Sequence, residues 1–168
     1  MDDWDNFYLL AGSTAGTLIG LIFIVITLGM DHAKAGDELR TRIFVTPILV
    51  YFTSLLVISM VMVPPISASA RAVSLGAIAC AGLAYVMNLA LLSRRRGKAN
   101  EQEPVWDVLL PLASYVLIAT AAAAWALEAS FANAIGAIGV VILLVTALRN
   151  SWIITLAIAG RGKGRGGR

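Results

Sequence analysis

Hydrophobic positions along the chain gather in long runs that short polar segments separate. The runs lack the alternation of strands, and about 20 apolar residues are enough to cross a bilayer as a helix. Five such runs follow one another, at residues 7–30, 43–63, 72–92, 105–127 and 132–148. The pattern predicts an all-α fold, a polytopic membrane helix bundle with five transmembrane helices. We expect a single domain over residues 1–160 and a flexible basic cytoplasmic tail at 161–168.

The composition agrees with this interpretation. Hydrophobic residues make up 59% of the 168 positions and charged residues 14%, whereas soluble domains are about 25% charged. A domain of this size leaves much of its surface exposed. Because this chain is so apolar, we expect that surface to be surrounded by lipid. The start, MDDWDN, has no positively charged segment, and we therefore expect no removable signal peptide.

Basic residues predict the orientation in the membrane. All but one of the 13 Lys and Arg follow the first, third and fifth runs, and the exception is Arg71. Positive loops stay in the cytoplasm, so the amino terminus is expected outside and the carboxyl terminus inside. The residues expected to meet lipid headgroups are Arg94, Arg95, Arg96, Lys98 and Arg149. The tail GRGKGRGGR could contact lipid or RNA; we favour lipid and expect no nucleic-acid partner.

Small residues recur at four-residue intervals and predict where helices pack. Glycines at 12, 16 and 20 would form a groove along the first helix, where another backbone can approach closely. The residues assigned to helix packing are Gly12, Gly16, Gly20, Gly76, Ala84 and Gly136. These rows could close the protein's own bundle or join identical copies, and the sequence leaves both alternatives open.

The polar residues inside the runs are hydroxyls rather than charges. The candidate pore-lining residues are Ser13, Thr17, Thr53, Ser54 and Ser114. They could form hydrogen bonds between helices, or line a neutral passage for water or weakly selected ions. The sequence contains no catalytic motif. It also contains no spacing typical of metal ligands, and the segment around His32 is no exception. We therefore expect no enzyme activity, no catalytic residue, no metal and no cofactor.

The first helix, FYLLAGSTAGTLIGLIFIVITL at residues 7–28, resembles that of a group of small bacterial integral-membrane proteins of uncharacterised function. In that group an Ala/Gly-rich start leads into a Gly-Leu-x-Phe core and a basic loop. The resemblance covers about 25 residues and implies a bacterial inner membrane. It supplies no functional residue.

Two functions agree with these features. The first is a self-associating protein that forms a homo-oligomeric channel or pore for small ions or neutral solutes. The second is a non-catalytic accessory or regulatory subunit that packs against another membrane protein in a larger complex. Both place the protein in the bacterial inner (plasma) membrane, with the lipid bilayer as a partner.

Overall fold

The computed structural model describes residues 3–30, 37–95 and 108–163, and all regular secondary structure in these ranges is helical. The helices are α1 (Asp3–Met30), α2 (Asp37–Met62), α3 (Ala68–Arg95), α4 (Leu110–Ala126) and α5 (Ala132–Lys163). The predicted all-α class is thus confirmed for the described residues. The helices follow the apolar runs because, in a chain this apolar, a helix satisfies its backbone hydrogen bonds within one segment.

Three helices are long and apolar enough to cross a membrane. Their apolar stretches are Trp4–Thr27, Ala68–Leu92 and Ala132–Ile153, with mean hydropathies of 2.2, 2.0 and 2.0. The apolar parts of the other two helices, Thr46–Met62 and Leu110–Ala126, are shorter. The three long helices are compatible with an integral membrane protein.

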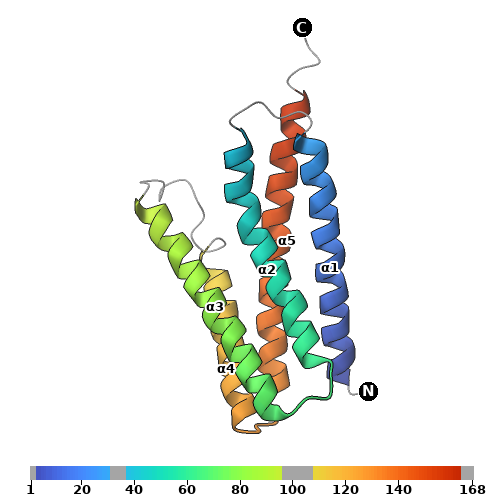
Figure 1. Cartoon of the computed structure of the whole chain (residues 1–168), viewed down its shortest axis with the longest axis vertical. Helices are drawn as coiled ribbons and strands as arrows, with labels where there is room; N and C mark the ends of the chain where they lie inside the picture. Colours follow the sequence, from blue (N-terminus) through green and yellow to red (C-terminus); the bar gives the residue numbers. More distant parts are fainter. Residues whose placement is uncertain (1–2, 31–36, 96–107, 164–168) are drawn as a thin grey trace.

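Each helix packs against the next one in the chain, and the last helix also contacts the first. α1 packs on α2, α3 on α4 and α4 on α5, and α5 also contacts both α1 and α2. Figure 1 shows α1 beginning at the same end as the α2–α3 and α4–α5 connections, while α5 finishes at the opposite end. We call the end at which α1 begins the N-terminal end of the bundle. α3 diverges from α2 toward the opposite end (Figure 1).

Large aromatic side chains fill the interior of the bundle. Tyr8 of α1, Tyr51 and Phe52 of α2 and Tyr115 of α4 are each at most 1% exposed. The rings of Tyr51 and Tyr115 lie 6.5 Å apart, between centroids, at an angle of 54°. Side chains of this size occupy the space between the helices, so the centre of the described chain is packed.

Two helix boundaries differ from the apolar runs. α5 continues without a break past Arg149 to Lys163, and therefore includes the first residues that the sequence assigns to the tail. α4 begins at Leu110, after a π-helical turn at residues 108–109, while positions 105–107 of the fourth run lie outside the described residues. Pro111 stands in the first turn of α4, where its missing N–H disrupts few hydrogen bonds.

Candidate functional site

The glycine row of α1 does not keep to one side of the bundle. A Cβ added at Gly12 would lie 2.7 Å from the Cβ of Ser59 in α2, closer than two nonbonded carbons approach. At Gly16 the added Cβ would lie 3.8 Å from Leu56 Cδ1, an ordinary contact, and at Gly20 no atom lies within 4 Å. Gly12 is thus a point of close helix approach, whereas Gly20 faces away from its own chain.

The geometry of the helix explains this change. Each residue turns by about 100°, so four residues overshoot one full turn by about 40°. Between Gly12 and Gly20 the row therefore moves about 80° around the axis. Gly16, Gly20, Ser13 and Thr17 are all exposed on the outside of the bundle. We call these four residues the outer face of α1.

The hydroxyls of this outer face bond to their own helix. Ser13 Oγ donates to the Leu9 carbonyl oxygen at 2.8 Å, and Thr17 Oγ1 donates to the Ser13 carbonyl oxygen at 2.9 Å. Such bonds satisfy the hydroxyl hydrogen and leave the oxygen able to accept. These side chains can therefore face lipid, a second helix or a water-filled passage.

Two other hydroxyls from the candidate pore-lining set lie between helices. Ser54 of α2 donates to the Val50 carbonyl oxygen at 2.9 Å, and its Oγ lies 2.9 Å from the hydroxyl of Tyr115. Since Ser54 has only one hydrogen to donate, the Tyr115 hydroxyl is the donor in the second bond. Ser114, fully buried, donates to the Gly139 carbonyl oxygen of α5 at 2.6 Å.

The five candidate pore-lining residues are therefore divided between two places. Ser54 and Ser114 lie inside the bundle, where they join α2 to α4 and α4 to α5. Ser13 and Thr17 lie on the outer face of α1, and Thr53 is exposed on the neighbouring α2. In the described part of the chain, buried aromatic side chains occupy the interior of the bundle, and the two sets therefore lie apart.

The remaining small residues also differ in their surroundings. Gly136, at the start of α5, faces α1: an added Cβ would lie 2.7 Å from the hydroxyl oxygen of Tyr8. That hydroxyl donates to the Asn133 carbonyl oxygen at 3.2 Å and so ties α1 to the first turn of α5. Gly76 of α3 makes a looser approach, with an added Cβ 4.0 Å from Ala122 Cβ, and Ala84 is exposed.

Two further glycines make close contacts: Gly82, which sequence reasoning missed, and Gly139, which the sequence places with Gly136 as a packing position of the fifth helix. The ring of Tyr115 lies directly against Gly82 of α3, in the space that a Cβ would take. In α5, a Cβ at Gly139 would lie 3.1 Å from both Ser114 O and Ile118 Cγ1. Gly139 stands three residues after Gly136 in the sequence, a spacing that signals a packing face. Nothing in the sequence pairs Gly82 with a tyrosine of another helix.

Of the residues expected to contact lipid headgroups, Arg94 and Arg95 lie at the end of the bundle opposite the amino terminus. Arg149 is half-buried within α5, and Arg94 and Arg95 form the last residues of α3. Arg96 and Lys98 lie outside the described residues. The positions of Arg94 and Arg95 agree with a basic end of the bundle, whereas Arg149 stands inside the apolar stretch Ala132–Ile153 of α5.

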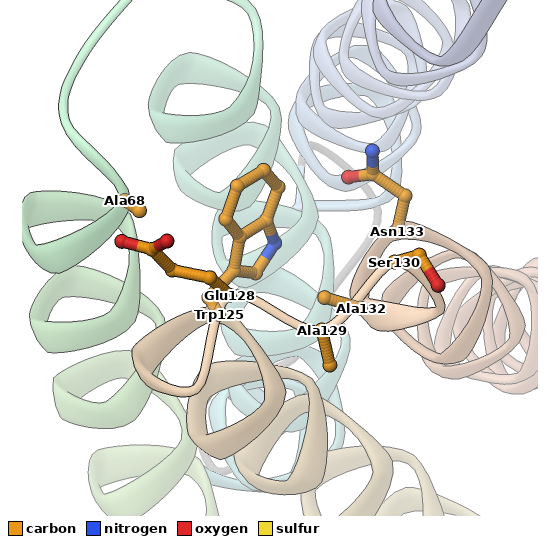
Figure 2. A pocket seen from close by; sticks show the side chains of 7 residues that line it. All are labelled: Ala68, Trp125, Glu128, Ala129, Ser130, Ala132 and Asn133. Atoms are coloured by element: carbon orange, nitrogen blue, oxygen red, sulfur yellow. The ribbon is translucent and has the colours of Figure 1, made fainter.

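A cavity of about 360 Å³ opens at the N-terminal end of the bundle. Figure 2 shows the Trp125 indole between the carboxylate of Glu128 and the amide of Asn133. The other lining residues are Ala68, Ala129, Ser130 and Ala132. The cavity thus combines one aromatic ring, one carboxylate and two uncharged polar side chains with walls made of alanine.

Arg71 of α3 lies beside this cavity, although it does not line it. Its guanidinium carbon stands 4.8 Å from the centroid of the Trp125 ring, and an Nη atom donates to the Pro64 carbonyl oxygen at 3.0 Å. Within the described part of the chain, Arg71 Nε and Trp125 Nε1 are buried without a hydrogen-bond partner. Arg71 is therefore held by a cation–π contact and by a backbone carbonyl.

The loop after α4 holds Glu128 in a left-handed conformation with φ 52°. The Glu128 N–H donates to the Trp125 carbonyl oxygen at 3.1 Å, and the Ala129 N–H donates to that of Ala124 at 2.9 Å. These two bonds form a Schellman motif, in which glycine is favoured at the position of Glu128. A side chain in this conformation costs about 1–2 kcal/mol.

Comparison with known proteins adds no assignment. No family model, curated protein or solved structure matches the chain. Among the described residues, no group of three His, Cys, Asp or Glu side chains could hold a metal ion.

Proposed function

We propose that the chain is a five-span integral membrane protein whose copies associate through the outer face of α1, with a passage for small ions or neutral solutes between them. The apolar part of α4 spans 17 residues, Leu110–Ala126, which is at the lower limit for crossing a bilayer. Because α4 packs between α3 and α5, it crosses alongside two longer helices. The basic end then faces the cytoplasm and the N-terminal end faces outward.

The observation that carries this proposal is the exposure of the outer face of α1. Lipid tails are as apolar as leucine, so a helix that only faces lipid has no need of small residues. A leucine at the same position would make more contacts with the lipid. Glycine is also unfavourable within a helix by about 1 kcal/mol relative to alanine. Gly16 and Gly20 are explained if the backbone of a second α1 approaches there. A second copy supplies this surface in self-complementary form.

The position of the hydroxyls supports a passage between copies rather than within one. The interior of each chain is occupied by aromatic side chains. Ser13 and Thr17, with Thr53 of the adjacent α2, are exposed on the outside. Their oxygens keep free lone pairs that can accept from water or coordinate a weakly held cation.

Cross-linking between copies tests the interface. The chain has one cysteine, Cys80, so a Cys80→Ser background carries single new cysteines cleanly. Gly20→Cys in native membranes is expected to give a disulfide-linked dimer under mild oxidation. Val116→Cys is the matched control, since Val116 is exposed on α4, which lies on another side of the bundle. Equal dimer from both positions, or none from position 20, would contradict the interface.

Conduction tests the passage. Purified protein in liposomes is expected to pass small ions or neutral solutes, and Thr17→Leu is expected to reduce the flux without lowering the amount of assembled protein. Liposomes that conduct nothing, across several ions and pH values, would remove the channel and leave self-association alone. A stoichiometric second protein in the particle from native membranes would instead favour the accessory-subunit function.

A further inference from the structure

The α4–α5 connection places a carboxylate at a backbone position that favours glycine. Among the described residues, Glu128 is the one non-glycine residue with positive φ. The chain contains 15 glycines, yet glutamate stands at this position. A side chain that works against its local backbone preference indicates that the side chain itself has a use.

The carboxylate of Glu128 lines the cavity at the N-terminal end of the bundle, beside Trp125 and across from Asn133 (Figure 2). The volume of about 360 Å³ is in the range of small-molecule sites. Asn133 and Ser130 add hydrogen-bonding groups from the first residues of α5 and the loop before it. One wall is therefore charged, one is aromatic, and the remainder is small.

The charges around the cavity favour a cationic occupant. Glu128 makes no ion pair with any described residue. The Trp125 ring already attracts one cation, the Arg71 guanidinium, which also bonds to the carbonyl of Pro64. Carboxylates and indole rings together are the groups that recognise organic ammonium ions. A single carboxylate lines the cavity, which is too few for a divalent metal ion. Arg71 beside the Trp125 ring repels any added cation, so the occupant is limited to a single positive charge that Glu128 can balance.

We propose that this cavity binds a small organic ammonium ion, with Glu128 as the charge partner and Trp125 as the aromatic wall. The ammonium group can belong to a free amine or to an amine-bearing lipid headgroup, because the N-terminal end lies at headgroup depth in the proposed orientation. This proposal does not depend on self-association through α1.

The first experiment titrates the full-length protein with free amines. The protein is placed in phosphatidylglycerol nanodiscs and titrated by calorimetry with ethanolamine and with tetramethylammonium chloride, against sodium chloride of equal ionic strength. Glu128→Gln is expected to weaken binding by roughly tenfold or more, the effect of losing one charge-assisted contact of about 1.4 kcal/mol. Asp5→Asn is the control, because it removes a carboxylate near the start of α1 that does not line the cavity.

The second experiment separates binding from folding. Glu128→Gly relieves the left-handed conformation, so its unfolding temperature is expected to rise by roughly 2–4 °C while ammonium binding is lost. A variant that is more stable yet does not bind distinguishes a ligand site from a structural carboxylate. If Glu128→Gly is instead less stable than the wild type, the carboxylate stabilises the fold and the proposal is overturned.

A third experiment identifies the source of the ammonium group. Protein extracted from membranes with equal phosphatidylethanolamine and phosphatidylglycerol is weighed by native mass spectrometry. Retention of phosphatidylethanolamine by the wild type, lost in Glu128→Gln, assigns the cavity to a lipid headgroup. Calorimetric binding of free amines without lipid retention assigns it to a soluble amine. The proposal fails if neither arm shows binding, or if Glu128→Gln behaves as the wild type in both.

Discussion

The hydroxyl of Tyr115 in α4 donates a hydrogen bond to Ser54 Oγ in α2 across 2.9 Å, at the centre of the bundle. The Tyr115 ring is held in this position by the backbone of α3, because it occupies the space beside Gly82 where a side chain would stand. Tyr115 of α4 thus contacts two other helices, α2 and α3, at once. Its hydroxyl is satisfied without water, as a buried polar group requires.

Gly82→Ala is expected to destabilise the bundle more than removing the hydroxyl of Tyr115. The new methyl group would overlap a rigid ring, and overpacking of this kind costs about 1–3 kcal/mol. Tyr115→Phe removes one interhelical hydrogen bond, worth about 0.6 kcal/mol in a membrane protein. Unfolding in a detergent–denaturant titration measures both. Combining Gly82→Ala with Tyr115→Leu should restore part of the loss; strictly additive losses would contradict the contact.

Substitutions along the glycine row of α1 are expected to separate folding from association. Gly12→Leu must push Ser59 and the α2 backbone away, so it should lower the stability of the single chain. Gly20→Leu meets no atom of its own chain, so the fold should persist while association between copies is lost. Unfolding midpoints and size-exclusion mass of the two variants give the comparison. Equal behaviour of the two variants would refute the rotation of the row around the helix.

Labelling from outside the cell tests the orientation. In the Cys80→Ser background, Asn6→Cys near the amino terminus is expected to react with a membrane-impermeant maleimide in intact cells. Gly166→Cys near the carboxyl terminus should react only after the cells are lysed, because the proposed orientation places the basic residues on the cytoplasmic side. Reaction of both positions from the same side would contradict an odd number of membrane crossings.

The sequence predicts the helices but misses contacts between residues that are far apart in the chain. The apolar runs predict the helices because length and hydrophobicity act within one segment, and the all-helical class follows. The sequence left open whether the fifth helix continues past Arg149 or bends onto the membrane surface, because a charged residue at an interface resembles the end of a span; α5 continues to Lys163. The contact of Gly82 with Tyr115 joins residues far apart in the chain, and one sequence contains no signal for it.

The glycine row of α1 illustrates a second limit. Four-residue spacing places Gly12, Gly16 and Gly20 on one ridge, but that ridge winds slowly around the axis. Only the position of α2 shows that Ser59 lies against Gly12 and that no atom of the described chain lies close to Gly20. Whether small residues close a bundle or face outward therefore depends on tertiary packing. The sequence alone left these alternatives open.

The mass of the particle extracted gently from native membranes tests the central claim most directly. Association through the outer face of α1 predicts a particle that contains two or more identical chains of 17.7 kDa and no other protein. The same measurement on Gly20→Leu should give a single folded chain. A wild-type particle with one chain, or a Gly20→Leu particle of unchanged mass, would contradict the account.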